Sequence, residues 1–211
     1  MPTMEQAQEW YRGVDAVHDF SHIQRVYHMA ERLALAEGAD LEIVHAAALL
    51  HDSRGTMPGS GERAEHHLAS AVFAAEVLAA EGWPQARIEA VQHCIRAHRF
   101  RDEREQPQTI EAKVLFDADK LDVLGAVGVM RTIGYAVLAG EPIYEQPSQT
   151  FLSTGEAEPG EPHSAYHEYL FKLRKIRNVL FTDTARAVAG ERDAYLAGFF
   201  DRLAAESRGE L

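Results

Sequence analysis

Apolar residues in this chain recur every three or four positions, the spacing that places side chains on one face of an α-helix. Residues 21–37 give an example, with Ile23, Val26 and Leu33 on a single helix face. Alanine and leucine are abundant, and runs of β-branched residues are scarce. Because this composition favours helices over strands, the sequence predicts an all-α fold.

The same periodicity divides the chain into helical segments separated by turns. Gly38 and Gly82 are placed to end helices, and Pro84 suits the first turn of the next one. The predicted helices are 21–37, 41–52, 65–81, 84–98, 109–124, 125–138, 164–180 and 183–206. Since no repeat or linker separates two cores, we predict one domain over 1–211, built as a single-domain helical bundle.

Residues 139–162 interrupt this pattern. They hold four prolines and show little periodicity, which is typical of a long loop. The loop would separate a core at about 15–138 from C-terminal helices at 164–206. Either a lid over a binding site or a mobile connection would fit such a loop.

The charge of the chain limits its partners. Its 33 acidic and 21 basic residues give a formal net charge of −12, whereas nucleic-acid binding depends on a basic surface. We therefore expect no nucleic-acid partner. An anionic substrate would need a local positive centre to overcome the field of the whole protein.

Cysteine usage and apolar runs indicate the compartment. Cys94 is the one cysteine, so no intrachain disulfide can form and a reducing environment is allowed. No apolar run approaches the roughly 18 residues expected of a membrane span. The first 20 residues do not resemble a signal peptide, and we expect a cytoplasmic protein without a membrane partner.

A histidine and an aspartate follow directly after the apolar run 46–50. Burying the carboxylate of Asp52 beside His51 is costly unless the group is paired or bound to a metal. Titratable residues also gather in "HDFSHIQRV" (18–26) and "DADKLD" (117–122). Imidazoles and carboxylates from different helices form a mixed nitrogen and oxygen site for a divalent cation. Such a cation would polarise a phosphoryl oxygen.

In their order along the chain, these groups resemble the H…HD…D pattern of the HD-domain metal-dependent phosphohydrolases. The resemblance implies an all-α core of the HD-domain type that holds one divalent metal, sometimes two. It implies His22, His51, Asp52 and Asp119 as the metal ligands. Among the three aspartates of 117–122, Asp119 fits because a basic residue and a leucine follow it, as in the family.

The resemblance extends to a bacterial subgroup of nucleoside triphosphate pyrophosphohydrolases, and it covers about residues 15–200. It implies hydrolysis of a small nucleotide to a monophosphate and pyrophosphate, usually with manganese. Iron, cobalt, nickel or magnesium would suit the same ligands. The apolar helix surfaces would also allow a homodimer. Adjacent residues of a regular helix point about 100° apart. His51 and Asp52 can therefore reach one ion only if it lies near the helix terminus or the last turn loosens, so we expect the pair in the last turn.

Charged side chains near the predicted ligands are candidates for catalysis. Asp52 or Asp119 would assist the deprotonation of attacking water. Arg25 and Lys120 would hold the charge on the departing phosphate. Arg25 lies one turn after His22 and shares its helix face. A surface ion pair is the alternative for Arg25, and a solvated position beside Asp117 is the alternative for Lys120.

Other basic residues are candidates for substrate binding. His67 and His98 could contact substrate or transfer a proton, although partly buried structural histidines are the alternative. His18, close in sequence to His22, is a candidate for substrate binding or for supporting a metal ligand. Lys172 could meet a phosphate tail. The remaining histidines, His66 among them, are interpreted as structural or exposed. The basic run "RKIRN" (174–178) is either a solvated helix face or a polyphosphate-binding surface.

Three other functions stay open at this point. The first is a nucleotidase that acts on monophosphates. The second is a phosphodiesterase that acts on cyclic nucleotides or other diesters, which a second metal held by His67 and His98 would favour. The third is a non-catalytic HD module that senses nucleotides.

Overall fold

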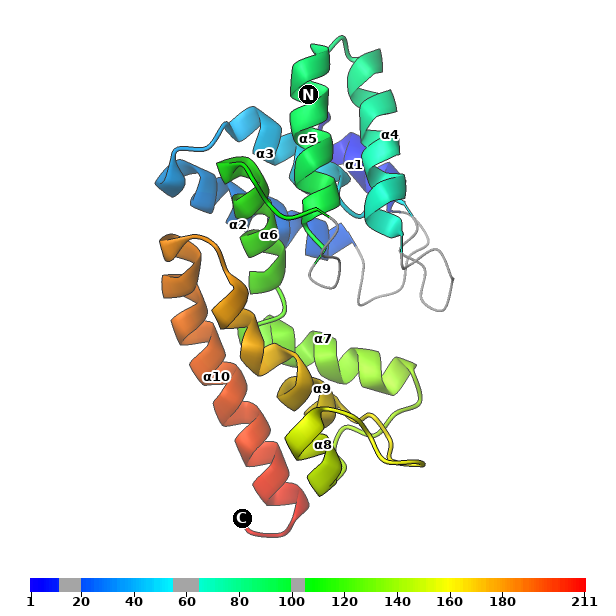
Figure 1. Cartoon of the computed structure of the whole chain (residues 1–211), viewed down its shortest axis with the longest axis vertical. Helices are drawn as coiled ribbons and strands as arrows, with labels where there is room; N and C mark the ends of the chain where they lie inside the picture. Colours follow the sequence, from blue (N-terminus) through cyan, green and yellow to red (C-terminus); the bar gives the residue numbers. More distant parts are fainter. Residues whose placement is uncertain (12–19, 55–64, 100–104) are drawn as a thin grey trace. The chain divides into compact units, whose positions relative to one another are not determined.

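The computed structural model describes residues 1–11, 20–54, 65–99 and 105–211, and all regular structure in these ranges is helical (Figure 1). The helices are α1 (Met4–Trp10), α2 (Phe20–Glu37), α3 (Leu41–Leu50), α4 (His66–Ala80), α5 (Gln85–Ala97), α6 (Ile110–Leu121), α7 (Gly125–Leu138), α8 (Gln149–Thr154), α9 (Ala165–Phe171), the 3-10 helix η2 (Leu173–Val179) and α10 (Asp183–Ser207). The all-α prediction is confirmed.

The described residues form two compact units. Unit 1 contains Met1–Asp119 and Phe181–Ala185, and unit 2 contains Lys120–Leu180 and Arg186–Leu211. Both α6 and α10 pass from one unit to the other. The prediction of a single domain over 1–211 stays a prediction.

In unit 1, α3 contacts α1, α2, α4 and α5, and α4 and α5 pack side by side as an antiparallel pair (Figure 1). Helix α3 is apolar over most of its surface, and seven of its ten residues are buried. Such a helix is stable only when neighbours cover it on several sides. One cluster of its core joins Ala7 and Tyr11 to Ile23 of α2 and Leu49 of α3.

The start of α3 is fixed by its N-cap. The Asp40 carboxylate accepts hydrogen bonds from the backbone N–H groups of Glu42 and Ile43. Arg87 of α5 donates two further hydrogen bonds to the same carboxylate, at 2.9 and 3.0 Å. The cap satisfies helix donors that would otherwise have no partner, and the arginine ties α3 to α5.

In unit 2, α9 packs against α7 and α10. The ring of Tyr169 stacks on Phe200 with centroids 4.7 Å apart. At the start of α7, a Cβ atom on Gly128 would clash with the carbonyl oxygen of Val123. Only glycine therefore allows this close approach.

Two of the predicted segments differ from the structure. Residues 164–180, predicted as one helix, form α9 and then η2. Leu170, Leu173, Ile176 and Val179 recur every three residues, and this spacing matches the three residues per turn of a 3-10 helix. Within 139–162, predicted as a loop, residues 149–154 form α8 between the N-cap Ser148 and Gly155. Helix α1 was not predicted either.

Among the described residues, no single helix is both long and apolar enough to cross a membrane. Helices α6 and α7 together reach the required length and composition, but the pair is bent by 66°.

Candidate metal centre

His51 and Asp52 lie at the end of α3, as the sequence predicts. Leu50 is the last helical residue, and His51 is the C-cap. His51 is fully buried, while the Asp52 side chain keeps 19% of its surface exposed. Their position frees the pair from the 100° separation of a continuing helix, so both side chains can serve one site.

Contacts with α4 hold the chain in place just after this pair. The Ser53 hydroxyl donates to the carbonyl oxygen of Leu50 at 2.9 Å. The backbone N–H of Arg54 donates to the Ser70 hydroxyl at 3.1 Å. The guanidinium of Arg54 lies 3.4 Å from the centroid of the Phe73 ring, a cation–π contact. The turn that presents Asp52 is thereby fixed on both sides.

Side chains from α2 and α6 complete the centre. His22 is buried on α2, and its Nε2 lies 3.5 Å from Oδ1 of Asp119 on α6 and 3.9 Å from Oδ2 of Asp52. One ligand atom from each of His22, His51 and Asp119 lies within 4.8 Å of the others. Three segments far apart in sequence therefore bring nitrogen and oxygen ligands to one place.

In His51 and His98, the ring nitrogen Nδ1 donates a hydrogen bond to the backbone, and this bond affects whether Nε2 can act as a ligand. Nδ1 of His51 donates to the carbonyl oxygen of Ala48 at 2.9 Å, and Nδ1 of His98 donates to that of Ile95 at 2.6 Å. A neutral imidazole has one N–H, so Nε2 of a neutral His51 ring carries a lone pair. Nε2 of His51 is buried and has no hydrogen-bond partner among the residues that the structure describes.

The ionisation of the neighbouring groups agrees with this picture. Burial lowers the pKa of His51 to about 4, so the ring is neutral at physiological pH. Burial alone would raise the pKa of Asp52, but the imidazoles of His51, His66 and His98 outweigh it and hold that pKa well below its usual range. A neutral imidazole therefore faces an ionised carboxylate, Nε2 to Oδ2, at 3.7 Å.

This donor set fits a divalent cation. At metal–ligand distances of about 2.1 Å, neighbouring ligand atoms of one ion lie roughly 3 to 4 Å apart. The distances around His22, Asp52 and Asp119 are in that range. Buried lone pairs directed at one another are costly without a positive charge between them, and a metal ion supplies that charge. The backbone hydrogen bond of His51 is also of the kind that orients metal-bound histidines.

Two more histidines reach Asp52 from its other side. Nε2 of His98, at the end of α5, lies 3.5 Å from Oδ1 of Asp52, and Nε2 of His66, at the start of α4, lies 3.3 Å from it. His51, Asp52 and His98 form a second group that could hold a metal. The sequence did not single out His66 for this position, and our interpretation of it as structural or exposed stays a prediction. Its position at the start of a helix directly before His67 was the available signal.

The other predicted residues take varied positions. Arg25 donates to the hydroxyl of Ser21 one turn earlier, at 2.8 Å. His67 is buried on α4, and Lys120, the residue after Asp119 on α6, is buried as well. Lys172 of unit 2 forms an ion pair with Glu168 at 3.2 Å. The roles predicted for these residues stay predictions, and His18 lies outside the described residues.

The two aspartates that flank Asp119 have other partners. The buried carboxylate of Asp117 accepts hydrogen bonds at 2.8 Å from the backbone N–H groups of Phe181 and Thr182 and from the Thr182 hydroxyl. Asp122 binds Arg131. Asp117 thus links α6 to residues 181–182, and Asp122 is linked to α7.

Comparison with known proteins places the chain in a family. The model of the HD domain family matches residues 19–124, the range that contains all four predicted ligands. The chain belongs to the HD domain family. The resemblance to HD-domain phosphohydrolases inferred from the sequence is thus confirmed.

Relatives of similar length match nearly the whole HD-domain chain. Bacillus subtilis YpgQ, an uncharacterised protein, is 31% identical over 206 residues, which cover 94% of this chain and 91% of YpgQ. The crystal structure of YpgQ in complex with ADP has a TM-score of 0.72 at 30% identity and covers 97% of each chain. An HD-superfamily hydrolase from Bacillus thuringiensis has a TM-score of 0.69 at 26% identity, covering 97% of this chain and 96% of its own.

Proposed function

We propose that this protein is a metal-dependent phosphohydrolase that cleaves nucleoside or deoxynucleoside triphosphates to a monophosphate and pyrophosphate. The observation that carries the proposal is the convergence of His22, His51 and Asp119. Within the described part of the chain, the buried Nε2 of His51 has no hydrogen-bond partner. The ADP complex of YpgQ supports a nucleotide as the ligand class. The likeness to the pyrophosphohydrolase subgroup supports the site of cleavage.

His22, His51, Asp52 and Asp119 would hold the cation, with manganese as our first choice and iron, cobalt, nickel or magnesium as alternatives. When bound, a divalent cation supplies Lewis-acid chemistry, because it polarises a phosphoryl oxygen and makes water a stronger nucleophile at neutral pH. In an acidic protein it also provides the local positive charge that a nucleotide requires.

The chain's own residues would divide the remaining work. The carboxylate of Asp52 or Asp119 would accept a proton from attacking water. Arg25 and Lys120 would stabilise negative charge on the phosphates. His67, His98 and Lys172 would bind substrate, and His66 joins these candidates because of its contact with Asp52.

Product analysis tests this proposal. The manganese-reconstituted protein is incubated with mixed nucleoside and deoxynucleoside triphosphates, and the products are separated by anion-exchange chromatography. We expect monophosphate and pyrophosphate in equal amounts, and neither product with His51→Ala or Asp119→Ala. His163→Ala is the matched control, because His163 lies exposed in unit 2. Orthophosphate as the product, or no turnover by metal-loaded protein, would contradict the proposal.

A second candidate function is a phosphodiesterase or nucleotidase of the same family. The observation that favours it is the position of His98 and His66 beside Asp52, because the two histidines and Asp52 could help to hold a second cation. Two metal equivalents per chain, with turnover of cyclic nucleotides or monophosphates, would support it. The cytoplasmic location, the homodimer and the lack of a nucleic-acid partner stay predictions.

A further inference from the structure

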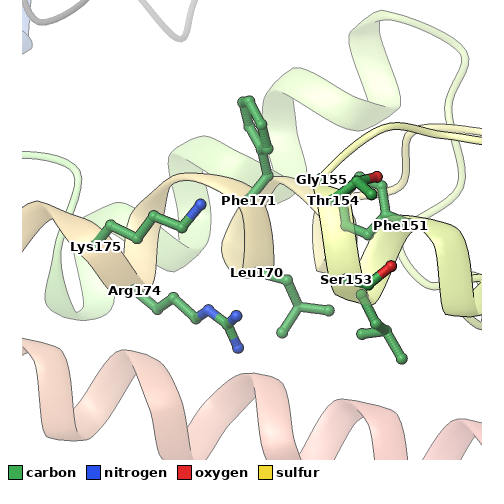
Figure 2. A pocket seen from close by; sticks show the side chains of 9 residues that line it. Phe151, Ser153, Thr154, Gly155, Leu170, Phe171, Arg174 and Lys175 are labelled. Atoms are coloured by element: carbon green, nitrogen blue, oxygen red, sulfur yellow. The ribbon is translucent and has the colours of Figure 1, made fainter.

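Unit 2 contains a pocket, and the described residues that line it all belong to this unit. It has a volume of about 180 Å³ and lies between α8 and the α9–η2 segment. Arg174 and Lys175 extend from η2 on one side, Ser153 and Thr154 lie on the α8 side, and Leu170 and Phe171 stand between them (Figure 2). The basic run 174–178 noted in the sequence thus contributes to a concave surface.

The charge of this pocket is opposite to that of the protein. None of the described residues that line it carries a carboxylate, although the chain has 33 acidic and 21 basic residues. Arg174 and Lys175 are exposed, and within the described ranges neither forms an ion pair. Lys172, two positions earlier than Arg174, does have a carboxylate partner in Glu168. A pair of uncompensated cations in an acidic protein attracts anions.

Packing contacts fix the walls of the pocket. Phe151 of α8 is buried and its ring lies 4.5 Å from that of His167. Gly155 ends α8 with φ at 80°, and a Cβ there would lie 3.1 Å from the ring of Phe171. Nζ of Lys175 lies 5.2 Å from the centroid of the same ring, within reach of a cation–π interaction. The pocket therefore exists before a ligand binds, which reduces the entropic cost of binding.

The volume of the pocket and its polar side chains limit the kind of ligand that it can bind. The cavity is smaller than the roughly 300 Å³ at which pockets for drug-sized ligands begin, so it suits a small group. The hydroxyls of Ser153 and Thr154 already donate to carbonyl oxygens within α8. Recognition therefore falls on the guanidinium fork of Arg174 and the ammonium of Lys175, a combination that suits the several oxygens of a phosphate.

We propose that the pocket formed by α8, α9 and η2 binds a small phosphate oxyanion, inorganic phosphate or pyrophosphate, through Arg174 and Lys175. The site is distinct from the metal centre, because its lining residues all belong to unit 2 and the metal-ligand candidates all belong to unit 1. The inference does not depend on the proposed function, since binding rather than turnover is what tests it.

The test is a titration of the full-length, magnesium-loaded protein with inorganic phosphate, followed by two-dimensional ¹H–¹⁵N NMR. We expect saturable shifts of the backbone amides of residues 153–155 and 174–175. Pyrophosphate should bind at least about 10-fold more tightly than phosphate, because it offers more charged oxygens to the two cations. Both affinities should fall as salt is added, since the cations are exposed. Acetate, a singly charged anion, should bind at least about 10-fold more weakly than phosphate.

Variants decide the assignment. Arg174→Ala/Lys175→Ala should abolish the shifts in 153–155 and keep the remaining spectrum, which also reports that the variant is folded. Arg202→Ala/Arg208→Ala, a matched change of two exposed arginines of unit 2 that pair with Glu206 and Glu210, should keep them. The inference is overturned if phosphate and pyrophosphate cause no saturable shifts there. Shifts that persist in the first variant, or acetate that binds as well as phosphate, would overturn it too.

Discussion

Nδ1 of His51 donates a hydrogen bond of 2.9 Å to the carbonyl oxygen of Ala48, three residues earlier in the same helix. The bond uses a carbonyl near the end of α3 that no later helical N–H reaches. It also fixes the tautomer, so that the lone pair of Nε2 points to the side where Asp52 and Asp119 gather. A single backbone contact thus orients the buried ring as the metal-ligand role proposed for His51 requires.

Replacing His51 by alanine should weaken metal binding strongly. The variant loses a preoriented neutral ligand, so we expect the dissociation constant for Mn²⁺ to rise by about 100-fold or more. Isothermal titration calorimetry of metal-free protein would measure the change. His163→Ala, which removes an exposed histidine of unit 2, should leave the affinity unchanged. Equal affinities in the two variants would remove His51 from the ligand set.

Asp117 and Asp119 should separate stability from metal binding. Asp117→Asn turns an amide N–H toward backbone donors that the carboxylate satisfies, so the free energy of unfolding should fall by about 2 kcal/mol. Its affinity for Mn²⁺ should hardly change. Asp119→Asn should weaken Mn²⁺ binding by about 100-fold with little loss of stability. Urea unfolding and calorimetry on both proteins measure the two effects, and each variant controls for the other. The reverse pattern would exchange the two roles.

The four metal ligands are predicted from the order of the motifs and from the cost of burying a carboxylate at the end of an apolar helix. Neither argument identifies His66 or places the candidate His98 beside Asp52, because both contacts depend on how α4 and α5 pack around α3. The hydrogen bonds of Asp117 depend on the return of the chain at 181–182, more than 60 residues later. Local pattern carries no information about such contacts.

The same limit applies to the fold. Long amphipathic helices such as α2 and α5 follow from periodicity, since their buried faces repeat over several turns. Helix α8 is shorter than two turns, and four prolines around it hide its own signals, the N-cap Ser148 and the left-handed Gly155. The break between α9 and η2 contains neither glycine nor proline. Only the three-residue spacing of its apolar side chains indicates the tighter helix.

Tyr11→Phe should destabilise unit 1 without changing its fold. The buried Tyr11 hydroxyl donates to the carbonyl oxygen of Leu49 at 2.9 Å, another acceptor at the end of α3. Removing the donor leaves that oxygen buried without this partner, and we expect a loss of about 1 kcal/mol in the free energy of unfolding. Urea unfolding at pH 7 measures it. Tyr195→Phe, at an exposed tyrosine, should cost nothing measurable. Equal stability of both variants would show that water replaces the Tyr11 hydroxyl.

Glu161 should make the segment around α8 sensitive to acid. Its carboxylate accepts hydrogen bonds from the backbone N–H groups of Ser148 and Glu158, both at 2.7 Å, and from Nε2 of His167. These backbone donors, aided by His167, lower the pKa of Glu161 to about 2. Because the folded pKa lies below the ordinary value of 4.5, the stabilisation is complete above about pH 4.5. It declines as the pH falls and is lost below about pH 2.

Glu161→Gln should reproduce this loss at neutral pH. Hydrogen exchange at the amides of Ser148 and Glu158 should become about 10-fold faster at pH 7, because the charge-assisted bonds become neutral ones. Corrected for intrinsic rates, exchange in the parent protein should speed up between pH 4.5 and 3, whereas exchange in Glu161→Gln should stay flat across that window. Glu156→Gln, at an exposed position of the same segment, is the matched control and should behave as the parent does. If the parent and Glu161→Gln exchanged alike at pH 7, the carboxylate would not be what anchors α8.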